Sequence, residues 1–256
     1  EWIDSRRNLN KTYEESLLLS PDSWKIFIKY GFDAISKIRH NHTNLLVQKT
    51  DDQKPVKGSR EEEILKKIYE HYNTKSSRYH FEALAELVTS SIFTQNGSSY
   101  RMGWITSASS DGGADFIGRL DLGSEFATVS VIVLGQAKCE AIDKPTGGNH
   151  IARTVARLKR GWIGAYVTTS YFSEAVQKEI IDDSYPIMLI HGKRLAQEVN
   201  NLMISKGYSD VSIFLESVDD AYTKRVKNKR PEEILLDINS IESATLLKMI
   251  SPAFND

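Results

Sequence analysis

An almost wholly apolar segment, Trp162–Thr168, constrains the fold of this 256-residue chain more than any other feature. A strand of this composition is buried on both faces of a sheet, so it requires helices above and below it. Helical patterns lie on either side of it, at about 149–160 and 173–183, and a strand at 186–190 and a helix at 193–206 follow. The segment therefore predicts an α/β fold with helices on both sides of the sheet.

Three earlier segments predict the rest of the sheet. Residues 100–106, 114–121 and 128–138 have the composition of strands and are separated by glycine-containing turns. Successive strands joined in this way form a meander, so we expect a mixed central sheet. Helices at 60–72 and 79–93, where apolar residues recur at helical spacing, precede these strands.

The same patterns divide the chain into three regions. Residues 1–58 are expected to form an N-terminal helical extension that ends in a polar linker. Residues 59–215 carry the strand and helix pattern of a compact domain. Residues 216–256 are expected to form a basic and helical tail, with lysines and arginines gathered at 224–230.

Composition excludes several classes of protein. The formal net charge of -1 excludes a histone-like polycation, although a local basic face remains open. The single cysteine, Cys139, excludes an internal disulfide framework and a multi-cysteine zinc site. No apolar run approaches the roughly 18 residues that span a bilayer, and the N-terminus lacks a signal region. We therefore expect a cytoplasmic protein that has no membrane partner.

Polar side chains end an otherwise apolar strand. Gln136 and Lys138 stand two residues apart, so they project from the same face. Burial would penalise both side chains, which suggests that the pair has a chemical role. Asp115 begins the preceding strand, and an antiparallel pairing can place it opposite Gln136. The sequence thus predicts a carboxylate, an amide oxygen and an ammonium at one edge of the sheet.

Phosphodiester hydrolysis uses this combination of groups. The Asp115 carboxylate and the Gln136 amide oxygen are hard ligands suited to Mg²⁺. Such an ion polarises a phosphate and makes its bound water more acidic. An ammonium group such as that of Lys138 orients the attacking water or neutralises charge in the transition state. Because glutamine replaces a second carboxylate, we expect weak metal affinity in the absence of DNA.

The order of a helix, Asp115 and then Gln136, Ala137 and Lys138 resembles the Mrr-like branch of the PD-(D/E)xK nucleases. With segments 160–164 and 167–173, the chain is most similar to the catalytic domain of the MspJI-type modification-dependent restriction endonucleases. The resemblance covers about residues 60–215. It implies a restriction-endonuclease-like core and Mg²⁺-dependent cleavage of double-stranded DNA, with Mn²⁺ as a substitute metal.

In that family a separate domain reads modified cytosine, and cleavage occurs at a distance from the mark. Residues 1–58 are too short and too helical for the β-rich, base-flipping module that the family uses. Two interpretations stay open: the chain is the nuclease part alone, or it is a relative with another sensor.

Two further groups of residues are candidates for the site. Glu82 lies in the helix before the sheet, where related nucleases supply an acid to the metal, so it is a candidate catalytic and metal-binding residue. A solvated helix face is the alternative, and Glu86, one turn later, is a weaker candidate. Candidate DNA contacts are His150 and a basic stripe predicted on the helix after the catalytic strand, formed by Arg153, Arg157 and Arg160.

The leading hypothesis is a metal-dependent DNA endonuclease. One such site cuts one strand, so cleavage of a duplex implies a homodimer or a higher oligomer. A structure-selective nuclease that resembles a junction resolvase is one alternative. A DNA-binding or oligomerisation module with an inactive nuclease site is the other.

Overall fold

The computed structural model describes residues 46–74, 77–95, 98–106, 114–123 and 128–236. The described residues from Lys49 onward belong to one compact unit. Three predictions lie outside the described residues: the helices of the N-terminal extension before residue 46, the turn after the first strand and the end of the helical tail, from residue 237.

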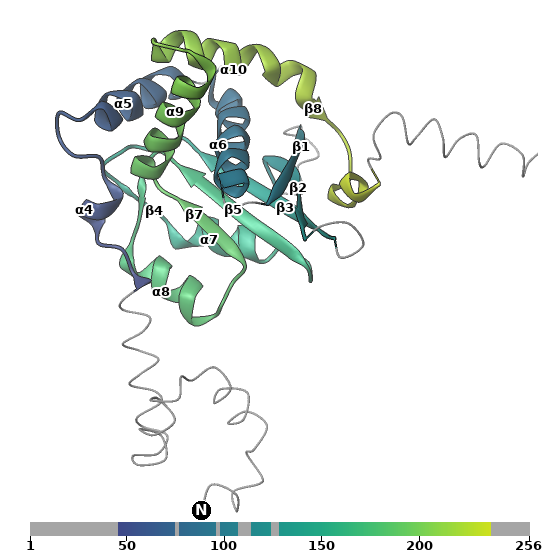
Figure 1. Ribbon diagram of the computed structural model, residues 1–256. Coiled ribbons are helices and arrows are strands. Elements are labelled where there is room, and N and C mark those ends of the chain that lie inside the picture. Colours follow the sequence, from purple (N-terminus) through teal and green to yellow (C-terminus); the bar gives the residue numbers. More distant parts are fainter. Residues whose placement is uncertain (1–45, 75–76, 96–97, 107–113, 124–127, 237–256) are drawn as a thin grey trace, which may run out of the picture. The chain divides into compact units, whose positions relative to one another are not determined.

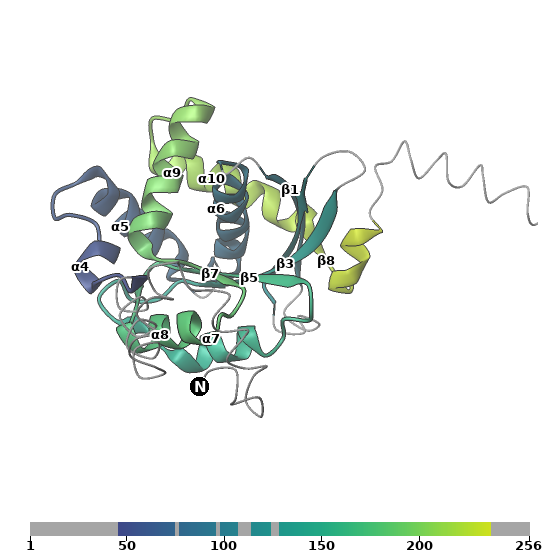
Figure 2. The same cartoon turned by 60° about the horizontal axis from the view of Figure 1, so that its bottom comes forward.

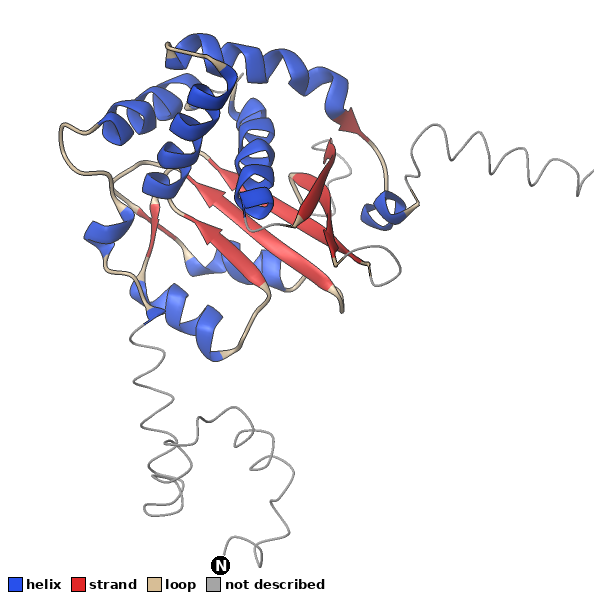
Figure 3. Cartoon of the chain, in the orientation of Figure 1, coloured by secondary structure: helices blue, strands red, loops and turns tan. Residues whose placement is uncertain are grey.

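The centre of the unit is a six-stranded mixed sheet with the order β7-β5-β3-β2-β1-β8 (Figures 1 and 3). Strands β1, β2 and β3 form the predicted antiparallel meander, and β5 and β7 continue it in parallel from β3. The short β8 pairs in parallel with β1. The bounds are Ser99–Thr106 (β1), Phe116–Leu122 (β2), Val129–Lys138 (β3), Trp162–Thr168 (β5), Ile187–Ile190 (β7) and Val226–Lys227 (β8). A separate pair joins β4 (Pro145–Thr146) to β6 (Tyr171–Phe172).

Helices cover both faces of the sheet, as predicted (Figure 2). One layer consists of α5 (Arg60–Tyr72), α6 (Phe81–Gln95), α9 (Gly192–Lys206) and α10 (Val211–Arg225). The opposite layer contains α7 (Gly148–Val155) and α8 (Glu174–Asp182). The shorter elements are α4 (Thr50–Gln53) and the 3₁₀ helices η2 (Arg78–His80) and η4 (Pro231–Leu235). None of the helices within the described ranges is long and apolar enough to cross a membrane.

Successive side chains of β3 point to opposite faces of the sheet and pack into two separate hydrophobic clusters. Val133 packs into the main core, which also contains Leu84 and Val88 of α6. Leu134 points to the opposite face and packs with Trp162 in a second cluster. The side chains at the end of β3 therefore emerge between two packed layers, where their backbone is held in place.

The compact unit extends beyond the predicted domain at both ends. The expected boundary at 215/216 falls inside α10, which packs against α5 and α6. The expected linker contains α4, whose Gln53 is buried. Its Nε2 donates to the Phe172 carbonyl at 3.1 Å, and Phe172 N donates to its Oε1 at 2.9 Å. Polar composition suggested a linker there, but the buried amide makes this segment part of the fold.

Candidate active site

Asp115 stands at the start of β2 and is held by the backbone on both sides. Its N–H donates to the Gly135 carbonyl at 2.8 Å, and its carbonyl accepts from Thr106 N at 3.0 Å. The carboxylate Oδ2 accepts from Ala137 N at 2.7 Å and from Gln136 Nε2. The predicted juxtaposition of Asp115 and Gln136 is confirmed. Since Nε2 is used in this bond, Oε1 is the atom of Gln136 that can bind a cation.

The register of β2 against β3 produces this arrangement. Phe116 pairs with Gly135, so the residue before Phe116 lies opposite the residue after Gly135. A side chain at Gly135 would overlap the ring of Phe116. Glycine at this position therefore lets Phe116 pack closely against β3, and the approach brings Asp115 to Gln136.

Lys138 is the last residue of β3 and is half-buried. It pairs with Thr168 on β5 and shares a face with Gln136. It opens into a cavity of about 430 Å³ that is also lined by Asp115 and Glu82. The structure therefore brings the four residues predicted to be catalytic to one place, with Gln136 bonded to Asp115 at the cavity wall.

The structure distinguishes the two candidate acids of α6. Glu82, in the first turn of the helix, lines the cavity. Glu86 is fully buried and accepts from Gly103 N at 3.0 Å and from the guanidinium of Arg225. Burial raises the pKa of Glu86 to about 7, although the neighbouring Arg225 opposes the shift. Glu86 thus joins α6 to β1 and α10, whereas Glu82 faces the site.

Sequence reasoning missed Glu140, which also lines the cavity. Its carboxylate accepts from Thr146 Oγ1 at 2.7 Å and from Thr168 Oγ1 at 3.4 Å. Its backbone N–H donates to Thr169 Oγ1 at 2.8 Å. The sequence does indicate Glu140, because it follows Lys138 by two residues, just as Lys138 follows Gln136. Arg78 and Tyr79 of η2, also missed, complete the exposed side of the cavity.

Two neutral groups lie near these acids. Burial, together with the nearby Glu82 carboxylate, raises the pKa of Tyr222 to about 12. Burial also raises the pKa of the Cys139 thiol to about 11. Both groups therefore stay protonated at neutral pH, and Cys139 packs against the main core as a small apolar side chain.

The donor set of the cavity fits a hard cation. Within the described ranges, no group of three or more His, Cys, Asp or Glu side chains has the arrangement of a metal site. The carboxylates of Asp115, Glu82 and Glu140 line the cavity, and the Gln136 amide lies beside Asp115. Mg²⁺ suits such a set, because it keeps several waters and needs few protein ligands. Structural zinc instead takes four, mostly cysteine and histidine.

The predicted basic helix is shorter than expected. It ends at Val155, so His150 and Arg153 lie on α7 while Arg157 and Arg160 lie in the loop before β5. After the helix, Leu158 packs against the cluster that contains Ile234 of η4. The prediction of one continuous helical stripe was wrong, yet all four side chains are exposed.

Comparison with known proteins agrees with this geometry. Residues 74–199 match the family model Mrr_cat, which describes a restriction endonuclease. The matched range includes Glu82, Asp115, Gln136 and Lys138. No curated protein is significantly similar to the chain.

Two solved structures are similar. The MspJI restriction endonuclease in complex with a 27-mer oligonucleotide is 40% identical, with a TM-score of 0.70 over 91% of this chain and 52% of that chain. The DNA modification-dependent restriction endonuclease AspBHI is 26% identical, with a TM-score of 0.59 over 69% of this chain and 44% of that one. The chain thus spans about half the length of each.

Proposed function

Since residues 74–199 belong to the Mrr_cat restriction endonuclease family, we propose that this chain uses Mg²⁺ to hydrolyse phosphodiester bonds of double-stranded DNA. Restriction endonucleases of this family are generally metal-dependent. The observation that carries the proposal is the cavity into which Asp115, Lys138 and Glu82 open, with the Gln136 amide bonded to Asp115 at its wall.

Asp115, the Oε1 of Gln136 and Glu82 are the proposed ligands, with Mn²⁺ as a substitute metal. The bound ion supplies a Lewis acid for the phosphate and makes its water more acidic. Lys138 holds the attacking water in line and offsets the charge that develops on the phosphate oxygens. The Ala137 N–H keeps the Asp115 carboxylate oriented.

The proposed partner is duplex DNA, and the proposed location is the cytoplasm. The proposed contacts to the DNA are His150, Arg153, Arg157 and Arg160. One site cuts one strand, so we propose that two or more protomers act on one duplex. Because MspJI and AspBHI extend well beyond the part that this chain matches, we propose that it is the cleavage part of an enzyme that depends on modified cytosine. The reading domain then lies outside this chain.

Plasmid digestion tests the proposed function. With Mg²⁺, we expect the chain to nick and then linearise supercoiled DNA, with similar rates on plasmids with and without modified cytosine. Asp115→Asn removes a ligand charge and should reduce the rate at least about a hundredfold. A strong preference for modified plasmid would place the reader within this chain.

Two other outcomes would point to other functions. Preferential cutting of four-way junctions would indicate a structure-selective nuclease. Absence of both cleavage and calorimetric Mg²⁺ or Mn²⁺ binding, with DNA present, would indicate an inactive binding module.

The two acids of α6 offer a matched pair of variants. Glu82→Gln should weaken metal affinity about tenfold to hundredfold, because it replaces a charged ligand with a neutral one. The cleavage rate should recover partly at high Mg²⁺ concentration. Glu86→Gln, one turn away in the core, should leave the metal requirement unchanged. Titration of the cleavage rate against Mg²⁺ concentration measures both, and equal shifts in the two variants would contradict a metal role for Glu82.

A further inference from the structure

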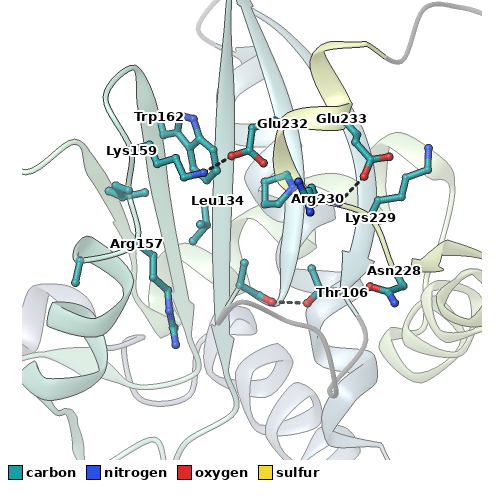
Figure 4. A pocket seen from close by; sticks show the side chains of 14 residues that line it. Thr106, Leu134, Arg157, Lys159, Trp162, Asn228, Lys229, Arg230, Glu232 and Glu233 are labelled. Carbon is teal, nitrogen blue, oxygen red and sulfur yellow. Dashed lines mark hydrogen bonds and ion pairs between the residues drawn. The ribbon is translucent and has the colours of Figure 1, made fainter.

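A second and larger cavity, of about 720 Å³, lies on the sheet face opposite α6. Figure 4 shows the side chains that line it. Leu134 and Trp162 form its floor. One wall is the loop from Arg157 to Lys159, and the other is the segment 228–233, which we call the strap. The proposed catalysis uses neither the strap nor the floor, so the cavity calls for a separate explanation.

This cavity lies next to the catalytic one. Thr106 lines both cavities, and Ala114, which lines the larger one, directly precedes Asp115. Leu134 shares a face with Gln136, only about 7 Å along the same strand. A DNA strand that has one phosphate at Asp115 therefore has its neighbouring phosphates close to the cavity floor.

The charges that border the cavity favour an anionic ligand. The cations Arg157, Lys159, Lys229 and Arg230 outnumber the carboxylates Glu232 and Glu233. Lys159 and Glu232 reach toward each other from opposite walls and form an ion pair (Figure 4). Their side chains are 64% and 44% exposed, and exposed ion pairs contribute only about 0 to 1 kcal/mol. A phosphate can therefore replace the Glu232 carboxylate at Lys159.

The strap is anchored to the core next to its C-terminal end. Ile234, just after it, is 3% exposed and packs in one cluster with Trp104. Lys229 Nζ lies 5.5 Å from the centre of the Trp104 ring, and Glu233 Oε1 accepts from Arg230 N at 2.7 Å. A preorganised wall loses little conformational freedom on binding. The strap lies outside residues 74–199, so it is not part of the region that matches the family model.

We propose that the strap and the Arg157–Lys159 loop hold the sugar–phosphate backbone of the substrate DNA beside the phosphate that is cut. The inference rests on the proposed function and names the part of the substrate that binds in this second cavity, which we call the groove. Charge complementarity supplies the affinity, so the contact is independent of base sequence. The groove thereby aligns the duplex with Asp115 and Lys138.

The test measures binding of a short duplex by fluorescence anisotropy at several salt concentrations, with Mg²⁺ and in the Lys138→Ala background. Lys229→Gln combined with Arg230→Gln should weaken binding about tenfold to hundredfold and lower the salt slope by about 0.9 for each cation lost. Lys159→Gln, on the opposite wall, should act in the same direction. Glu232→Gln should tighten binding, because it removes a competing carboxylate.

Lys206→Gln is the matched control, since Lys206 is exposed on α9 and does not line the cavity. Unchanged affinity and salt slope in the variants of both walls would overturn the groove and leave the proposed function intact. If the strap variant loses thermal stability, the Lys159→Gln result decides alone. A parent protein that binds no duplex would remove the proposed function and the groove together.

Discussion

Lys138→Ala is expected to lower the rate of plasmid nicking in Mg²⁺ by about a hundredfold to a thousandfold while DNA binding is retained. The ammonium stands at the end of β3, in the same cavity as Asp115 and Glu82. Loss of the ammonium leaves the attacking water unoriented and the developing negative charge without a nearby cation. Binding depends mainly on the surface cations, so the duplex affinity should change little.

Lys144→Ala is the control for this experiment. Lys144 is exposed, follows Lys138 by six residues and does not line the cavity. Its replacement should leave the nicking rate at the level of the parent. Lys138→Arg should recover only part of the activity, because a guanidinium keeps the charge but not the shape of an ammonium. Undiminished cleavage by Lys138→Ala would remove the assignment of this residue.

Arg225→Ala is expected to destabilise the fold by about 3 to 5 kcal/mol at pH 8, since it leaves the buried Glu86 without its cationic partner. The loss should shrink at pH 5.5. Burial raises the folded-state pKa of Glu86 to about 7, above the value of about 4.3 in an unfolded chain. The folded protein therefore binds the additional proton between these values, and the contribution of this group to stability falls as pH rises through 7.

Urea unfolding of the parent and the variant at pH 5.5 and pH 8 measures this effect. In the variant no guanidinium opposes burial, so the folded-state pKa of Glu86 rises further and the carboxyl stays protonated to a higher pH. The double variant Arg225→Ala with Glu86→Gln should regain part of the stability at pH 8, because no charge is then buried. An equal loss at both pH values would show that packing, and not charge, dominates at Arg225.

Much of the fold follows from the sequence. The apolar run Trp162–Thr168 and the three preceding strands were predicted in their observed order, and the helix at 60–72 has the observed bounds. The spacing of apolar residues is a local property of the sequence, because it depends directly on whether one or both faces of an element are buried. The pair of Asp115 with Gln136 was also predictable, because strand register and two-residue alternation relate these positions without knowledge of the helices.

Other features depended on contacts between distant segments. Glu82 and Glu86 stand one turn apart on α6. Glu86 is buried in an ion pair with Arg225 of α10, whereas Glu82 lines the cavity. The helix before β5 stops at Val155, and Leu158 then packs against the cluster that contains Ile234 of η4, a contact that no local pattern contains. The strap acquires its place in the same way, through Ile234.

The sequence by itself determined the succession of strands along the chain, the mixed sheet and the acid, amide and ammonium at one edge. Only the tertiary structure decided which acid of α6 faces that edge, that Glu140 lines the cavity, and that the cations after Arg225 border a second cavity next to it. The physical reason is the range of the interactions. Alternation and helical spacing act over a few residues, whereas burial of a charge depends on every segment that packs around it.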